Sequence, residues 1–172
     1  MKTCSIIGHR KIEETKELEI KVKNIIINLI EKEKVTEFLF GSKSEFNDLC
    51  YDIVTDLKGK YFNINRIFVR AEYPTISDDY YNYLKKFYED TYFYDKKLIS
   101  NKFSYIRRNQ VVIDKSDFCL FYFDINYIPK TKNQSKTDIY IPNPTSARRS
   151  GTSIAYNYAV KKLKTIINVV ET

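Results

Sequence analysis

The sequence predicts an α/β protein, a Rossmann-like three-layer sandwich in which a mainly parallel sheet of about five or more strands carries helices on both faces. Short apolar runs alternate with amphipathic helical segments along the 172 residues. This alternation is typical of parallel sheets that are covered on both sides. The apolar content of 43%, with only 4 Gly and 4 Pro, excludes a disordered or collagen-like chain.

The N-terminal part of the chain alternates between strand and helix patterns. Apolar runs predict strands at residues 3–7, 38–40 and 67–69. Apolar side chains that recur every three or four positions predict helices over residues 14–34 and from 46 to 57. These segments give the order βαβαβ for the first part of the domain.

Local signals mark the ends of these two helices. Ser42 and Glu45 have the spacing of a capping box, which predicts that the second helix begins there. Glu13, Glu14 and Glu17 occupy the predicted first turn of the first helix, where the helix dipole favours acidic side chains, and Gly59 is a natural stop for the second helix.

The C-terminal part continues the alternation. An aromatic-rich segment at its start is expected to begin as a helix, and a long polar loop with three prolines is of the length often used as a functional lid. The predicted segments are an aromatic helical segment at 78–94, a helix at 104–115, a strand at 118–123, a loop at 124–149, a helix at 151–163 and a strand at 165–170.

The net charge of +7 belongs to one region. Residues 96–150 hold 11 Lys and Arg against 4 Asp and Glu, whereas the rest of the chain sums to zero. This concentration predicts an anionic partner, unless the region is an ordinary solvated basic loop. The basic residues show no RNA-binding signature, and Arg148 and Arg149 precede a predicted helix start. A small phosphate is therefore favoured, and nucleic acid is the less favoured partner.

Several function classes are excluded or disfavoured by the composition. No apolar run reaches the ~18 residues of a membrane span, and the apolar stretch at the N-terminus is too short for a signal peptide. Cys4, Cys50 and Cys119 lie in apolar segments at wide spacings, which predicts buried free thiols and a cytoplasmic location. His9 is the single histidine, so we expect no Cys/His zinc site, and we expect no cofactor.

Candidate ligand-binding residues follow the ends of the predicted strands, where ligands of open α/β sheets bind. Small residues there let backbone N–H groups approach an anion, a helix N-terminus adds partial positive charge, and arginine pairs with phosphate. Each residue also has a plainer reading, such as a tight turn for a glycine or an N-cap for Ser150. The candidates are Gly8, His9, Arg10, Gly41, Ser42, Arg70, Tyr73, Arg148, Arg149, Ser150, Gly151 and Thr152.

A set of short motifs, spread over nearly the whole chain, resembles the SLOG superfamily and is most similar to its YpsA-like branch. The resemblance implies one SLOG-like nucleotide-binding domain over residues 1–172 and adds Arg108 and Asn109 as base contacts. The motifs are Cys4-Ser-Ile-Ile-Gly8-His9-Arg10-Lys11, Phe40-Gly41 with Glu45-Phe46, Tyr94-Asp95, Arg108-Asn109 with Asp114-Lys-Ser116-Asp117, and Ser150-Gly151-Thr152 with Ala159.

The LOG enzymes of this superfamily resemble phosphoribohydrolases whose motif Pro-Gly-Gly-x-Gly-Thr-x-x-Glu supplies a catalytic glutamate. Ala155 stands at the corresponding place in this sequence, and an alanine cannot transfer a proton. We therefore expect no catalytic residue, although Asp114, Asp117 or Glu45 would be available to an enzyme of another design.

The function expected from these observations is non-catalytic binding of a phosphorylated nucleotide or an ADP-ribose-type signalling molecule. The protein would act as a sensor or as a sequestering sponge in the conflict between phage and host defence. Two alternatives stay open: a nucleotide N-glycosidase or phosphoribohydrolase-type enzyme, and nucleic-acid binding through the basic region 96–150. Members of the superfamily often pair, so a homodimer is expected, with the tyrosine-rich segment 80–94 as a candidate face.

Overall fold

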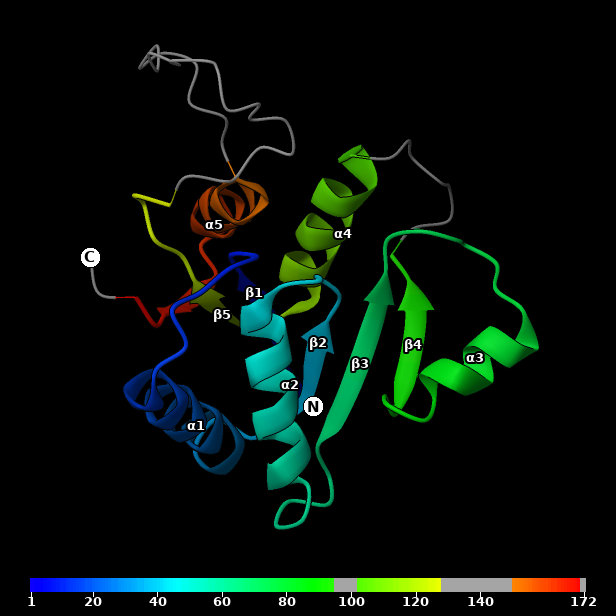
Figure 1. Cartoon of the computed structure of the whole chain (residues 1–172), viewed down its shortest axis with the longest axis horizontal. Helices are drawn as coiled ribbons and strands as arrows, with labels where there is room; N and C mark the ends of the chain where they lie inside the picture. Colours follow the sequence, from blue (N-terminus) through cyan, green and yellow to red (C-terminus); the bar gives the residue numbers. More distant parts are fainter. Residues whose placement is uncertain (95–101, 128–149, 171–172) are drawn as a thin grey trace, which may run out of the picture.

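The computed structural model describes residues 1–94, 102–127 and 150–170. Its six strands form one sheet in the order β4-β3-β2-β1-β5-β6, and every neighbouring pair is parallel (Figure 1). The strands are β1 (Lys2–Gly8), β2 (Val35–Phe40), β3 (Asn65–Arg70), β4 (Asp90–Phe93), β5 (Phe118–Tyr122) and β6 (Thr165–Asn168). The helices are α1 (Lys16–Glu31), α2 (Glu45–Leu57), α3 (Asp78–Leu84), α4 (Lys102–Lys115) and α5 (Gly151–Lys161).

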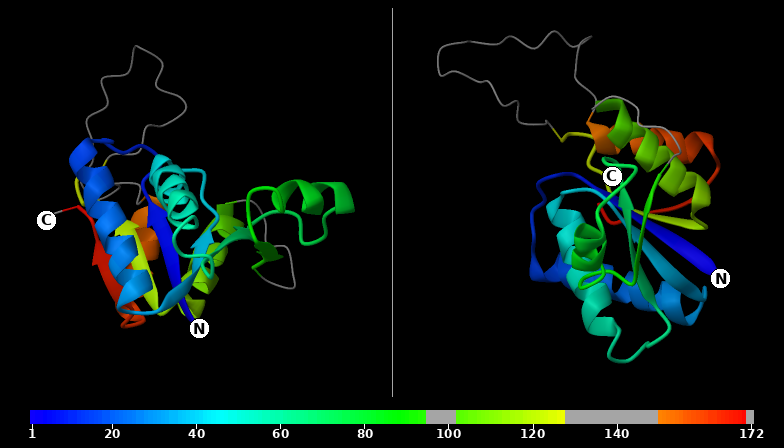
Figure 2. Two further views of the ribbon diagram at one scale, coloured as in Figure 1. Left: turned by 90° about the horizontal axis from the view of Figure 1, so that it is seen from below. Right: turned by 90° about the vertical axis from the view of Figure 1, so that its right-hand side faces the viewer.

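Helices cover both faces of the sheet, which confirms the predicted three-layer α/β class. Figure 2 shows α1 and α2 on one face, α4 and α5 on the other, and α3 beside the edge strand β4. The larger buried cluster joins α1 and α2 to the sheet and includes Phe38 and Phe46. Two smaller clusters lie under α4 and α5, around Phe121 and Val69. The strands are therefore held from both sides, and their carboxyl ends meet at one edge.

Gly8 lets the start of α2 approach the end of β1. A Cβ atom added at Gly8 would lie 2.5 Å from the Cβ atom of Phe46, which is fully buried in α2. Any larger residue at position 8 would clash with Phe46, so the fold itself requires glycine here.

The start of α2 differs from the predicted capping box. Ser44, and not Ser42, is the N-cap, and its side chain accepts from the N–H of Asn47. Glu45 is then the first helical residue, so its carboxylate cannot return to the cap. It accepts instead from the N–H of Ile12 at 3.0 Å and pairs with Lys11, which fixes the loop after β1 to α2.

The aromatic-rich segment 78–94 contains a strand that the sequence pattern does not predict. The segment begins as α3, as expected, but the chain then turns and residues 90–93 pair with β3 as β4. Of the predicted loop 124–149, residues 128–149 lie outside the described part, so its lid role stays a prediction.

The three cysteines are free and buried, as predicted. Burial raises the pKa of the Cys4 and Cys50 thiols well above the usual range, so both stay protonated. Among the described residues, no helix is both long and apolar enough to cross a membrane.

Candidate functional site

A pocket of about 730 Å³ lies at the carboxyl ends of the strands. The loops after β1, β2 and β3 line it, together with α4 and the start of α5. Twelve of the fourteen predicted site residues are part of its wall, namely Gly8, His9, Arg10, Gly41, Ser42, Arg70, Tyr73, Arg108, Asn109, Ser150, Gly151 and Thr152. Arg148 and Arg149 lie outside the described residues.

Arg108 on α4 is a buried cation without a carboxylate partner in the described part of the chain. Its side chain donates to the carbonyl of Gly41 and, at 3.1 and 3.0 Å, to Oδ1 of the adjacent Asn109. Only 3% of the residue is exposed, and burial lowers its pKa to about 10, so the guanidinium stays charged at neutral pH. Three of the five guanidinium N–H groups are thus used, and two are left for a ligand.

Gly41 makes this position of Arg108 possible. A Cβ atom at Gly41 would lie 2.7 Å from the Val69 carbonyl and 2.9 Å from Nη1 of Arg108. The loop after β2 is also held by α2, because Oδ1 of Asn47 accepts from the N–H groups of Gly41 and Ser42 at 3.4 and 3.3 Å. The absence of a side chain at Gly41 therefore lets the guanidinium contact the end of β2.

Arg70, at the end of β3, supports the rim of the pocket. Its Nη1 atom donates to the carbonyl of Tyr73 at 2.7 Å, and its buried Nε atom has no partner among the described residues. Tyr73 has a φ of 57°, a left-handed conformation that is strained for a tyrosine, and the residue is 65% exposed. Arg70 thus holds Tyr73 in a conformation that presents its ring to solvent at the pocket.

His9 forms part of the wall as a neutral side chain. It is 1% exposed, and its Nε2 atom lies 3.0 Å from the N–H nitrogen and 3.1 Å from the carbonyl oxygen of Asp124. Its ring stacks on Tyr127 with 3.8 Å between centroids. Burial lowers its pKa, against the opposing effect of Asp124. His9 therefore joins the loops after β1 and β5 and adds no positive charge to the pocket.

The first turn of α5 forms a further part of the pocket wall. Ser150 is its N-cap and accepts from the N–H of Ser153 at 3.0 Å. The N–H groups of Gly151 and Thr152 precede the first intrahelical hydrogen bonds, so they are open to an anion. A Cβ atom at Gly151 would meet no described atom within 4 Å, so the described part of the chain leaves room for a side chain at this turn.

The pocket is strongly cationic and ringed by tyrosines. The described residues of its wall include five cations and one carboxylate, that of Glu72, which accepts a hydrogen bond from Tyr105; one of the cations, Lys11, is paired with Glu45 outside the wall. The cations are Arg10, Lys11, Lys43, Arg70 and Arg108, and the tyrosines are Tyr73, Tyr80, Tyr105 and Tyr127. Lys11, Lys43, Glu72, Tyr80, Tyr105 and Tyr127 were not among the predicted site residues. For Tyr105 a signal exists, because it precedes Arg108 by three residues and shares its face of α4.

The three acidic residues that the sequence offers to an enzyme, Asp114, Asp117 and Glu45, are engaged in other contacts. Asp117 accepts from the N–H of Thr3 at 2.8 Å, Asp114 accepts from the hydroxyl of Tyr158, and Glu45 binds the loop after β1. None of these three lines the pocket. Ala155 is 2% exposed and packs in the cluster under α5. Among the described residues, no group of three or more His, Cys, Asp and Glu side chains is placed to hold a metal ion.

Comparisons with known proteins identify the fold. No protein-family model matches the chain, and no curated protein sequence matches it. Two solved structures are similar in fold: DNA processing protein A (DprA) from Streptococcus pneumoniae, with a TM-score of 0.54 and 14% identity, and DprA from Helicobacter pylori, with 0.55 and 16%. Each alignment covers 96% of this chain, but only 49% and 63% of the two DprA chains.

These neighbours change the sequence-based account of the partner. The H. pylori protein is described by its binding of single-stranded DNA. The expectation that nucleic acid is the less favoured partner is therefore wrong, and neither neighbour supports a small-molecule ligand or a sensor role. The shared fold agrees with the Rossmann-like fold that the SLOG resemblance implies. It gives no support to the YpsA-like branch, which stays a prediction.

Proposed function

We propose that the pocket binds single-stranded nucleic acid, with a backbone phosphate at Arg108 and the start of α5 and with bases stacked on the tyrosines at its mouth. Arg108 carries this proposal. Burying a cation without an ion pair costs several kcal/mol, and no described carboxylate forms an ion pair with Arg108; Glu72 acts on it only from a longer distance. A phosphate supplies the missing charge, and its oxygens match the two free N–H groups of the planar guanidinium.

The tyrosines distinguish a nucleic acid from a simple anion. Tyr73, Tyr80 and Tyr105 are 65%, 40% and 44% exposed although they surround a cationic pocket. Proteins that bind single strands combine a positively charged groove with aromatic rings on which successive bases stack. The pocket has both features within one wall, and the DNA-binding neighbour of the same fold gives independent support.

Two glycines provide a matched test of the pocket. Gly151→Glu places a carboxylate in open space at the start of α5, so the fold is preserved while phosphate is repelled. Gly59→Glu adds the same charge in the turn after α2, where a Cβ atom meets only the Asp56 carbonyl at 3.5 Å. Fluorescence anisotropy with labelled oligothymidylate measures both variants. We expect Gly151→Glu to weaken binding by at least about tenfold, the effect of about 1.4 kcal/mol, and Gly59→Glu to bind as the wild type does.

The same titration separates the rival functions. Equal weakening by both glycine variants, or no binding by the wild type, would overturn the proposal. Displacement of the oligonucleotide by AMP or ADP-ribose at much lower concentration would favour the nucleotide-binding hypothesis. Mass spectrometry of the recovered ligand covers the enzyme hypothesis, because a nucleotide N-glycosidase releases a free base.

A further inference from the structure

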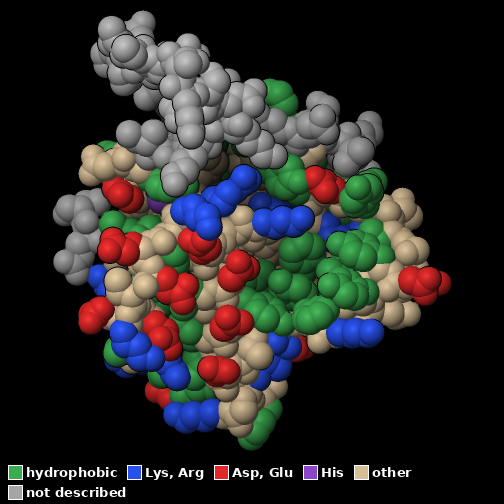
Figure 3. Space-filling view, in the orientation of Figure 1, with side chains coloured by type: hydrophobic (Ala, Val, Ile, Leu, Met, Phe, Trp, Pro, Cys, Tyr) green, Lys and Arg blue, Asp and Glu red, His purple; other side chains and the backbone are tan. Residues whose placement is uncertain are grey.

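We infer that the strand leaves the pocket over α3 and that its bases stack on a second surface, the aromatic patch formed by Tyr51, Tyr80, Tyr83, Phe87 and Tyr88. This inference rests on the proposed function. It goes beyond that function in two respects: it assigns an interaction surface that extends outside the pocket, and it specifies the ligand as a single strand longer than the pocket can hold. Figure 3 shows hydrophobic side chains gathered on the face that carries α2 and α3.

The patch is exposed and continuous with the pocket. Tyr80, Tyr83 and Phe87 are 40%, 52% and 43% exposed. The rings of Tyr80 and Tyr83 are nearly parallel, 13° apart with 6.2 Å between centroids, and Phe87 follows at 5.3 Å from Tyr83. Tyr80 also lines the pocket, so a strand whose phosphate lies at Arg108 finds these rings next to the exit.

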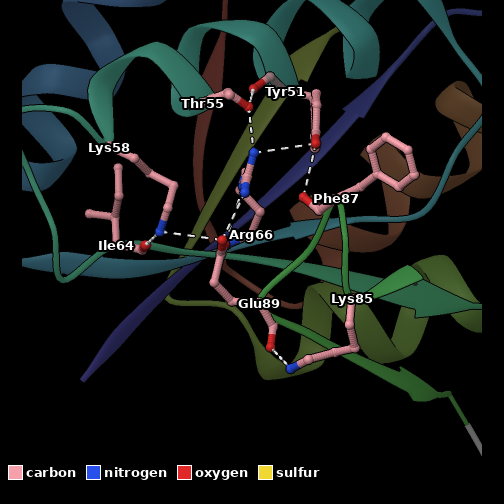
Figure 4. A network of polar contacts seen from close by, with 8 residues as sticks. All are labelled: Tyr51, Thr55, Lys58, Ile64, Arg66, Lys85, Phe87 and Glu89. Atoms are coloured by element: carbon pink, nitrogen blue, oxygen red, sulfur yellow. Dashed lines mark hydrogen bonds and ion pairs between the residues drawn. The ribbon is translucent and has the colours of Figure 1, made fainter. Parts of the chain in front are cut away.

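A polar network holds the far end of the patch rigid (Figure 4). The hydroxyl of Tyr51 donates to the carbonyl of Phe87 at 2.8 Å, and Arg66 donates to the same hydroxyl at 3.2 Å. Arg66 in turn pairs with Glu89 at 2.7 Å, which ties the turn before β4 to β3 and α2. In Figure 4 the Phe87 ring points away from this network. The rings are thus placed before a ligand arrives, which reduces the entropy cost of stacking.

The exposed surface of the patch consists of uncharged aromatic rings, which favours contact through bases. Charges of both signs border it: the exposed acidic residues are Asp48, Asp52, Asp78 and Asp79, and the basic ones are Arg66 and the exposed Lys85 and Lys86. Burial and then the neighbouring Tyr51 and Asp48 raise the pKa of Tyr88 to about 12, which shows that Asp48 lies close to the rings. These opposite charges offset one another, whereas a base that stacks on an uncharged ring needs no ionic contact. The patch should therefore add affinity that does not depend on salt.

An oligonucleotide-length series tests this surface separately from the pocket. The probes are oligothymidylates of about 4 and about 16 nucleotides, the limits for a compact single-strand site. Tyr83→Ala and Phe87→Ala remove exposed rings, and Phe62→Ala removes an 85% exposed ring outside the patch as the matched control. We expect each patch variant to weaken the long probe by about tenfold and the short probe by little, with an unchanged slope of affinity against salt.

Each other outcome counts against the inference in a distinct way. If both probes bind equally less well, the rings act within the pocket or stabilise the fold, and do not contact an extended strand. If neither probe loses affinity, the rings do not contact the nucleic acid at all. Either result overturns the inference but not the proposed function. A loss equal to that of Phe62→Ala overturns it as well. Failure of the wild type to bind either probe overturns the proposed function itself.

Discussion

Burial of the charged Arg108 side chain destabilises the fold but places a guanidinium in the wall of the pocket. The residue is almost fully buried, and among the described residues no carboxylate forms an ion pair with it, although the charge of Glu72 acts on it from a longer distance. The phase of α4 explains its place, because the buried residues Ser104 and Val112 lie four residues before and four residues after Arg108 on the same face of the helix. The sequence names Arg108 as a candidate through a motif, but its burial beneath Gly41 depends on how α4 packs against β2, which no local pattern reports.

Arg108→Met should not destabilise the free protein. Burial lowers the pKa of Arg108 from 12.5 to about 10, which corresponds to about 3 kcal/mol of unfavourable burial of the charge. Methionine removes this cost and loses the hydrogen bonds to the Gly41 carbonyl and to Asn109, worth about 1 kcal/mol each, so the two effects nearly cancel. We expect the free energy of unfolding in urea to stay within about 1 kcal/mol of the wild type or to rise. A decrease of more than about 3 kcal/mol would identify Arg108 as a structural clamp.

His9 should make the protein less stable in mildly acidic solution. Burial lowers its pKa in the folded state below the usual 6.5, so the unfolded chain binds the proton more tightly. The contribution is complete above pH 6.5 and is lost as the pH falls through the folded pKa. Urea unfolding between pH 7 and pH 5 measures this loss, which His9→Gln should abolish because His9 is the single histidine. An identical pH dependence of unfolding in the wild type and in His9→Gln would show that protonation of His9 does not cause the loss of stability.

At the scale of elements, the strands and helices with regular apolar spacing are predictable, and β4 is not. Its four residues, Asp90 to Phe93, follow directly on an aromatic helix, and four residues are too few to show a period of two. What fixes β4 is a contact remote in sequence. The side chain of Glu89 accepts from the N–H of Arg66 at 2.7 Å, and Glu89 donates its own N–H to the Arg66 carbonyl at 2.9 Å.

The Arg66–Glu89 pair should contribute to stability above pH 4.5. Burial alone would raise the pKa of Glu89, but the hydrogen bonds and charge of Arg66 lower it to about 2. The stabilisation is therefore present above the unfolded pKa of 4.5 and is lost as the pH falls from 4.5 toward 2. Glu89→Gln should cost about 1–3 kcal/mol at pH 7 and flatten the acid dependence of unfolding. A wild-type-like acid transition in Glu89→Gln would show that the pair is not formed.

At the scale of the whole molecule, the alternation of strand and helix is enough to predict a parallel sheet and the edge at which the pocket lies. Gly8, Gly41 and Ser150 were placed at that edge because the carboxyl ends of parallel strands meet there. The sequence does not predict Tyr80 and Lys43 as pocket residues. Tyr80 lies on α3 at the edge of the sheet and Lys43 lies inside the loop after β2, and their positions in the sequence do not show that they come close to the pocket. The amino-acid composition likewise cannot distinguish a mononucleotide from a nucleic acid as the ligand.

The salt dependence of nucleic-acid binding tests the central claim most directly. Each phosphate neutralised on a single strand contributes a slope of about −0.7 to the logarithm of affinity against the logarithm of salt concentration. Anisotropy titrations of the wild type and of Arg108→Met with one oligothymidylate, over a range of salt, measure this slope. We expect a negative slope for the wild type that becomes shallower by about 0.7 in Arg108→Met, together with weaker binding. An unchanged slope would show that Arg108 contacts no phosphate and would contradict the account of the pocket.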